Sequence, residues 1–224
     1  MTTFVLVPGA GGQAWYWHRV VAELERRGHV AVAVELPSGD ETAGLAAYAD
    51  AVVTAAGDRS PLVVVAQSMG GLTAPLVCDR VDVELLVLLN AMVPSPGETG
   101  GEWWRATGQA DAQAEYFARL GLENGDDDAV TYFHDVPAEV AATAMEQPLT
   151  QSMRPFEEPW PLASWPDVPT RVLTGRDDRL FPAEFQARVA RERLGLEPEL
   201  MPGGHLVALS RPVELADRLE SYAR

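Results

Sequence analysis

Residues 63–71 read VVVAQSMGG, and this stretch decides the fold. Its apolar run predicts a buried strand, and the small-x-Ser-x-Gly sequence that ends it predicts a sharp turn into a helix. Gly70 meets the demand of such a turn for a position without a side chain, while Ala66 stands where glycine is more usual. The turn lifts the Ser68 hydroxyl above the edge of a sheet, at a helix N-terminus that favours developing negative charge. Ser68 is therefore a candidate nucleophile; the alternative is a buried serine in a turn of small residues.

Strand and helix patterns alternate on both sides of this stretch. We expect strands at 4–7, 30–36, 62–66, 85–89, 171–174 and 199–201, and helices at 15–27, 42–56, 68–80, 182–194 and 212–222. Each crossover is long enough for a parallel connection, which predicts an α/β fold with an open parallel sheet of about six strands flanked by helices. Pro75 is expected to shift the start of helix 68–80 or to kink it.

The stretch 95–160 breaks this alternation, because it has turn clusters and short helix-like pieces but no strand pattern. We expect it to be an inserted helical cap, with 1–94 and 161–224 forming one core domain. Its acidic run at 126–128 is expected to be a solvated loop or a helix N-cap rather than a metal site.

Composition and charge exclude several classes of protein. The chain has 224 residues, of which 47% are hydrophobic and 22% charged, as in a folded globular domain. All 17 basic residues are arginine, so no lysine is available for a Schiff base, a P-loop or a Ser-Lys pair. The net charge of −16 opposes binding to nucleic acid and to anionic membranes. Cys78 is the only cysteine, which excludes an internal disulfide and a cysteine zinc cage.

The sequence also bears on the cellular location and the oligomeric state of the protein. The sequence has no apolar run of about 18 residues and no basic leader, so we expect no membrane span and a cytoplasmic location. We also expect no metal, no cofactor, and a monomer or a homodimer.

A serine nucleophile needs a base, and the chain has four histidines. His205 follows residues 202–204 directly after the last expected strand, at the carboxyl edge where open α/β sheets place their sites. We therefore expect His205 to be the base. His29 opens the second strand at the opposite edge, and His18 is expected to pack on the first helix. His134 lies in the expected cap and could at best touch a substrate.

An acid that orients the imidazole is expected after strand 171–174, where Asp177 and Asp178 both follow the same sheet edge. The spacings Gly175-x-x-Asp178 and Asp178-x-x-x-Pro182 favour Asp178 and leave Asp177 as its exposed neighbour. The order Ser, Asp, His along the chain matches the order of nucleophile, acid and base found with this type of serine turn.

Two backbone amides are expected to face a reacting oxygen. One belongs to Met69, directly after Ser68; the other should come from the glycine-rich loop 8–12, where we choose Ala10. Glycines in this loop let the backbone approach a carbonyl closely. The same loop suggests a phosphate cradle, but its spacing differs from a P-loop, and the missing lysine and the negative charge oppose phosphate.

Together these features resemble the α/β-hydrolase superfamily over nearly the whole chain. The start of the chain is similar, more narrowly, to the small plant-type methylesterase and hydroxynitrile-lyase group and its bacterial relatives. The residues that carry this narrower similarity are 4–10, Trp15, Trp17 and 28–30. The resemblance implies a serine hydrolase whose catalytic triad and oxyanion hole are Ser68, Asp178 and His205, and the amides of Ala10 and Met69.

The chain departs from the pattern of this group in three places. Pro8 replaces the usual histidine, and Ala66 replaces the first glycine of the serine turn; both are tolerable changes. The hydroxynitrile lyases resemble each other in having a threonine where Gly9 stands and a lysine in the cap, so cyanide chemistry is not expected here. Dehalogenases and epoxide hydrolases of the superfamily use an aspartate where this chain has Ser68.

Aromatic side chains gather in the expected cap, which holds eight of the chain's 17 aromatic residues. We expect about two-thirds of them to pack in the cap's own core and the rest to line an apolar cavity. Substrate contacts are expected from Trp104, and from Phe181 and Leu206, which flank the acid and the base. The stretch 95–160 has a net charge of −10, which disfavours anionic acyl carriers, so the expected substrate is a neutral, small-to-medium carboxylic ester.

The resemblance leaves other activities open beside a carboxylesterase or methylesterase. A lactonase, a thioesterase or a C–C bond hydrolase in a biosynthetic pathway would use the same triad. A ligand-binding protein with slow turnover, like some hormone receptors of this fold, would also keep it.

Overall fold

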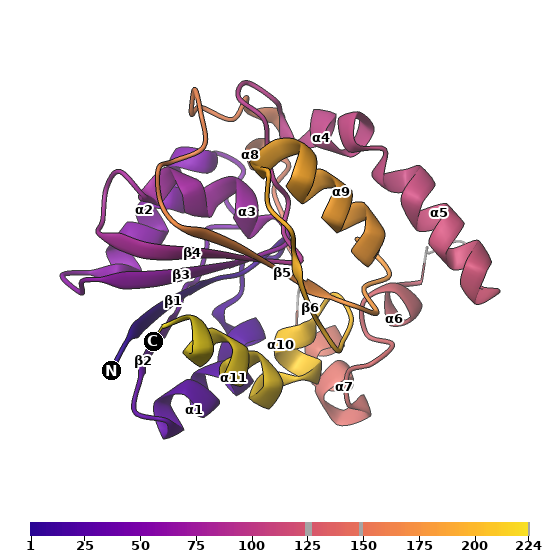
Figure 1. Ribbon diagram of the computed structural model, residues 1–224, viewed down its shortest axis with the longest axis horizontal. Helices are drawn as coiled ribbons and strands as arrows, with labels where there is room; N and C mark the ends of the chain where they lie inside the picture. Colours follow the sequence, from indigo (N-terminus) through magenta and orange to yellow (C-terminus); the bar gives the residue numbers. More distant parts are fainter. Residues whose placement is uncertain (124–126, 148–149, 224) are drawn as a thin grey trace.

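One parallel sheet organises the chain (Figure 1). The computed structural model describes residues 1–123, 127–147 and 150–223, and within these residues six strands pair in the order β2-β1-β3-β4-β5-β6. The strands are β1 Thr3–Val7, β2 Val30–Ala33, β3 Leu62–Gln67, β4 Val83–Leu89, β5 Thr170–Gly175 and β6 Glu199–Met201. Every neighbouring pair is parallel. The predicted α/β fold with an open parallel sheet is confirmed.

Helices cover both faces of this sheet (Figure 1). The helices α1, α10 and α11 pack on one face, and α2, α3 and α9 on the other. Their bounds are α1 His18–Arg26, α2 Leu45–Ala56, α3 Gly70–Thr73, α9 Ala183–Leu194, α10 Val207–Ser210 and α11 Pro212–Tyr222. In the part of the chain that the structure describes, no helix is both long enough and apolar enough to cross a bilayer.

Burial of both sheet faces explains the continuous apolar runs of the strands. In β1, Phe4 and Leu6 point toward α1 and α11, whereas Val5 and Val7 point toward α2; all four side chains are fully buried. Successive side chains of a strand face opposite sides, so a strand covered on both sides must be apolar throughout. Each of these side chains stabilises the fold by about 1.5–3 kcal/mol.

Several elements differ from the sequence expectation, most clearly the third helix, the second strand and α10. In place of helix 68–80 the chain forms α3 and then a 3-10 helix, η2, at Ala74–Val77. Pro75 lies at the start of η2 and has no N–H group with which to continue α-helical bonding. The second strand ends at Ala33 rather than at residue 36. The short helix α10 was not expected.

The segment between β4 and β5 is helical among its described residues. It contains α4 Gly100–Thr107, α5 Gln109–Leu120, α6 Asp128–Thr131, α7 Ala138–Glu146 and α8 Arg154–Glu157. These helices gather beyond the carboxyl ends of the strands (Figure 1). The two ends of the segment lie side by side, because Thr99 and Pro159 form an antiparallel bridge and the Gly97 amide donates to the Trp160 carbonyl at 3.0 Å.

The acidic run at 126–128 begins with Asp126, which lies outside the described residues. Asp127 is the N-cap of α6, and its carboxylate accepts a hydrogen bond from the Ala129 amide at 2.8 Å. The expectation of a helix N-cap is confirmed for Asp127. A capping aspartate also favours this short helix through its charge at the positive end of the peptide dipoles.

Candidate active site

Ser68 occupies a strained turn between β3 and α3. Its φ is +52°, a left-handed conformation that costs a residue with a Cβ about 1–3 kcal/mol. The turn is held because the Ser68 amide donates to Leu89 at 3.3 Å and the Ser68 carbonyl accepts from Met92 at 2.9 Å. A Cβ on Gly70 would lie 2.8 Å from the Pro8 carbonyl oxygen, and one on Gly71 would overlap the Met92 carbonyl. The two glycines are therefore required by close packing of backbone against backbone.

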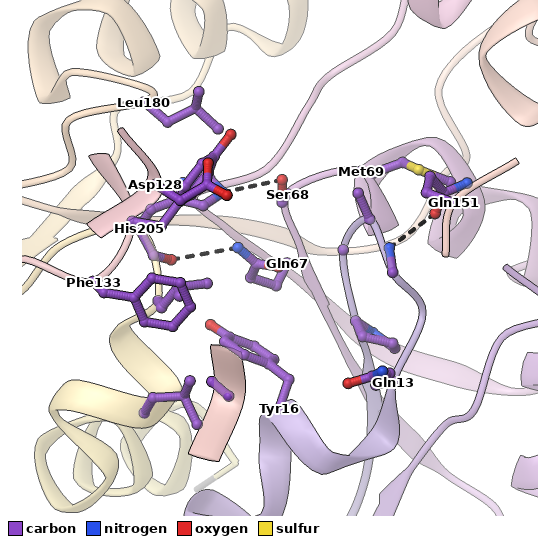
Figure 2. Close-up of a pocket in the computed structure, with 18 of the residues that line it drawn as sticks. Gln13, Tyr16, Gln67, Ser68, Met69, Asp128, Phe133, Gln151, Leu180 and His205 are labelled. Carbon is purple, nitrogen blue, oxygen red and sulfur yellow. Dashed lines mark hydrogen bonds between the residues drawn. The ribbon is translucent and has the colours of Figure 1, made fainter. Parts of the chain in front are cut away.

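Ser68, His205 and Asp178 form a hydrogen-bonded chain. The Nε2 atom of His205 lies 3.1 Å from Ser68 Oγ, and its Nδ1 atom lies 2.9 Å from Asp178 Oδ2. Because an ionised carboxylate only accepts, Nδ1 carries the proton and Nε2 is left to accept from the serine hydroxyl. Figure 2 shows Ser68 between His205 on one side and Met69 on the other. The structure thus brings together the three side chains that the sequence analysis selected.

Asp178 is fully buried and its charge is offset by hydrogen bonds. Its Oδ1 atom accepts from the amides of Leu180 and Phe181, each at 2.9 Å, and Oδ2 accepts from the Gln186 amide at 3.3 Å as well as from His205. Asp177 is exposed, and its Oδ2 atom accepts a hydrogen bond from the Gly203 amide at 3.2 Å. Of the two candidate acids, only Asp178 contacts the imidazole.

The loop after β1 brings Ala10 to the same cavity. The Gly12 amide donates to the Gly9 carbonyl at 3.1 Å, which closes a tight turn, and Gly11 within it has a φ of +86°. Ala10 and Met69 both line the cavity in front of Ser68. Among the described residues neither of their amides donates a hydrogen bond, so both are free to bind a ligand oxygen.

The cavity in front of Ser68 has a volume of about 330 Å³. Trp104 and Leu206 line it, as expected. Phe181 differs from these two residues: it is 1% exposed, and it is not among the described residues that line the cavity. Its ring instead packs edge-on against His205, with the ring centres 5.2 Å apart, while Leu180 takes the place in the wall. Phe181 therefore contacts His205 without lining the cavity.

Aromatic residues of 95–160 contribute more to the cavity wall than expected. About a third of the eight aromatic residues in this segment were expected to line the cavity, and half of them do: Trp104, Tyr132, Phe133 and Phe156. The Tyr132 ring lies 5.7 Å from the His205 ring, at 66° to it. His205 thus contacts two aromatic rings from different segments of the chain.

Several polar residues of the cavity were missed by the sequence analysis. The Tyr16 ring points toward Gln67 and Phe133 (Figure 2), and burial raises the pKa of its phenol far above the ordinary value. Tyr16 therefore stays neutral and can donate to a bound ligand. The side-chain oxygen of Gln151 accepts from the Gly11 amide at 2.9 Å and so braces the turn that carries Ala10. Tyr16 stands between Trp15 and Trp17, two residues that carry the family resemblance, but nothing local distinguished Tyr16 or Gln151 as a cavity residue.

Asp128 is the one carboxylate among the described residues that line the cavity, and no arginine lines it there. Burial raises the pKa of Tyr132, the residue that follows α6, and the Asp128 charge raises it further. Because the carboxylate is exposed, it gives the entrance a negative field without a desolvation penalty.

The other three histidines are not among the described residues that line the cavity. His18 is exposed and stacks on Trp15, with the ring centres 4.6 Å apart. His29 Nδ1 accepts a hydrogen bond from the Thr2 amide at 3.3 Å. His134 is half-buried, and both burial and the Arg179 charge lower its pKa.

The chain belongs to the alpha/beta hydrolase family, whose model matches residues 4–218. It is similar to "Probable esterase PIR7A" of Oryza sativa, with 39% identity over 112 residues, which are 44% of this chain and 42% of the relative. It is also 34% identical over 104 residues to "Methylesterase 7" of Arabidopsis thaliana, covering 41% of this chain and 40% of the relative. The match thus spans about two-fifths of the length of these relatives.

Solved structures share the fold along the whole chain. A pyrethroid hydrolase from Sphingobium faniae JZ-2 superposes with a TM-score of 0.76 over 99% of this chain and 97% of its own, at 23% identity. At that identity the likeness concerns the fold. It agrees with the superfamily resemblance drawn from the serine turn.

Proposed function

We propose that this protein is a serine hydrolase of carboxylic esters, of the carboxylesterase or methylesterase type. One observation carries the proposal: the hydrogen-bonded chain Ser68–His205–Asp178 reaches a cavity that is also lined by Ala10 and Met69, whose amides donate no hydrogen bond among the described residues. This arrangement has every group that acyl transfer needs: a nucleophile, a base, an orienting acid and an oxyanion site.

The proposed reaction has two halves. His205 removes the Ser68 proton as Oγ attacks the ester carbonyl, and the alcohol then leaves with that proton. Water attacks the acyl-enzyme with the same help from His205, which releases the acid. Asp178 keeps the imidazole in one tautomer and stabilises its charged form. The amides of Ala10 and Met69 stabilise the oxyanion, a contribution of about 3–4 kcal/mol for a donor of this kind.

The proposed substrate is a neutral ester of small to medium size. The cavity of about 330 Å³ is at the lower end of the range for small-molecule sites, and much of its wall is aromatic or aliphatic. Asp128 repels an anionic substrate and also an anionic product, so it favours both entry of a neutral ester and exit of the free acid. The names of the relatives, esterase and methylesterase, agree with this class.

We also propose that 95–160 acts as a cap on a core made of 1–94 and 161–224. Supporting this division, the segment is closed at its base by the Thr99–Pro159 bridge and contributes four aromatic rings to the cavity. Exchange of this segment is then expected to change substrate preference and leave the hydrolytic chemistry in place.

A fluorophosphonate probe tests the proposal, because it reacts with a serine whose base and oxyanion site are assembled. We expect a single adduct, mapped by mass spectrometry to Ser68, in the wild type and none in Ser68→Ala. The control is Ser95→Ala, which changes a serine outside the cavity. A folded wild-type protein without the adduct would contradict the proposal and favour a ligand-binding role.

A substrate screen then separates the activities that share this mechanism. Neutral methyl and aryl esters, lactones and thioesters are offered to wild type and to Ser68→Ala at equal concentration. We expect the highest kcat/KM for neutral esters. A preference for lactones or thioesters would retain the triad but replace the proposed substrate class.

A further inference from the structure

The strand that precedes Ser68 and the strand that precedes His205 are separated by two other strands of the sheet. Ser68 follows β3, whereas His205 follows β6, and β4 and β5 lie between them in the sheet. Three strand spacings amount to roughly 14 Å, which a histidine side chain cannot span. The loop after β6 therefore folds back over the ends of β5 and β4, and some group has to hold it there.

Asn90 occupies the end of β4, in the middle of that gap. Its Nδ2 donates to the carbonyl oxygens of Gly204 at 3.0 Å and His205 at 3.1 Å. Its Oδ1 accepts from the Gly175 amide at 2.7 Å, at the start of the loop that carries the acid. A single side chain thus joins the two loops that bear acid and base.

The backbone of Asn90 is adapted to this position. The residue is fully buried and has a φ of +46°, a left-handed conformation that asparagine tolerates better than most residues with a Cβ. Its own amide donates to the Leu173 carbonyl at 3.0 Å, which anchors it to β5. The strained backbone aims the side chain at the loop that carries His205.

Gln186 of α9 extends the same network to the acid. Its Nε2 lies 2.8 Å from the Phe181 carbonyl, 3.3 Å from Asp178 Oδ2 and 3.3 Å from Asn90 Oδ1. Its Oε1 accepts from the Thr174 hydroxyl at 3.2 Å. Asp178 Oδ2 is therefore held by Gln186 on one side while it accepts from the imidazole on the other.

We propose that Asn90 and Gln186 are positioning residues that hold His205 and Asp178 at their working separation, an assignment that rests on the proposed esterase function. Any buried polar group needs partners, and a purely structural role would meet that need as well. The two amides, however, bind the acid itself and the backbone of both loops at the site. Their loss is therefore expected to displace the base, and not only to lower stability.

Three variants separate these roles. Asn90→Gly removes the side chain and keeps the left-handed backbone accessible; Gln186→Met removes the amide at nearly constant volume. The matched control is Thr107→Val, which removes a buried hydrogen bond of 2.7 Å to the Trp103 carbonyl, away from the cavity. Each protein is measured for thermal unfolding, kcat and KM on one neutral ester, the rate of fluorophosphonate labelling, and the downfield proton NMR signal of the His205 Nδ1–H group.

We expect kcat and the labelling rate to fall between about tenfold and a hundredfold in Asn90→Gly and Gln186→Met, with KM nearly unchanged and the imidazole signal shifted. Thr107→Val should lose stability and keep kcat and the signal. Labelling and kcat equal to wild type in either folded variant would overturn the assignment of that residue, and Gln186→Met decides the network if Asn90→Gly does not fold. Absence of labelling in the wild type would instead refute the esterase proposal itself.

Discussion

Replacement of Gly9 by alanine tests the oxyanion loop directly. A Cβ built on Gly9 would lie 2.5 Å from Gln67 Oε1 and 2.8 Å from Ser68 Cβ, where ordinary contacts begin at 3.4 Å. The loop must therefore move by roughly 0.6–0.9 Å, or Gln67 must leave its place beside the His205 carbonyl. A misplacement of about 1 Å can reduce a rate about a hundredfold, and the loss of one oxyanion donor costs about 3–4 kcal/mol. We expect kcat of Gly9→Ala to fall about a hundredfold or more.

Single-turnover hydrolysis of a neutral aryl ester measures this effect, because acylation is the step in which the oxyanion first forms. The control is Gly39→Ala, whose added Cβ would meet Thr150 at 3.6 Å, an ordinary contact on the surface. Thermal unfolding of both variants is recorded, so that a loss of fold is not mistaken for a loss of chemistry. Acylation within about threefold of wild type in a folded Gly9→Ala protein would refute the reasoning about this loop.

Three further predictions concern charge and protonation. Asp178→Asn should lower kcat about 10⁴-fold, because the asparagine favours the wrong imidazole tautomer; a folded variant with near-normal kcat would exclude Asp178 as the orienting acid. Asp128→Asn should reduce the preference for a neutral over an anionic ester about fivefold, the effect of about 1 kcal/mol at an exposed site, whereas Glu139→Gln on α7 should not. Burial and the neighbouring Asp79 raise the pKa of the Cys78 thiol to about 12. At pH 9 the reactive thiolate should therefore be scarce, and alkylation should be about 500-fold slower than for a thiol of pKa 9; a rate like that of the unfolded chain would contradict this.

The fold could be predicted because its signals are local. Residues 4–7 of β1 and 62–66 of β3 are buried on both faces of the sheet and form unbroken apolar runs, and the steric demand of the serine turn appears directly as Gly70 and Gly71. Short spacings to Gly175 and Pro182 also favoured Asp178 over Asp177 as the acid, and the structure places only Asp178 against the imidazole. The prediction of one helix over 68–80 was wrong for a local reason as well. Pro75 was expected to shift or kink this helix, but the chain instead changes there from an α-helix to a 3-10 helix.

The remaining features depend on contacts between distant parts of the chain. Phe181 was expected in the cavity wall because it lies near Asp178, yet packing against His205 turned it behind the base. Asn90 carried only the weak signal of a polar residue at the end of an apolar strand, and its partners lie 114 and 115 residues away.

The sequence by itself determined where the candidate nucleophile, acid and base stand along the chain, because strand ends, tight turns and glycine requirements depend on neighbouring residues. Only the tertiary structure decided the distances between these groups, the residues that brace them and the side chains that line the cavity. The physical reason is that Ser68 and His205 are 137 residues apart and meet at 3.1 Å only when four strands, two loops and a helical segment pack together. No local preference encodes such a meeting; it results from the burial and hydrogen bonding of the whole domain.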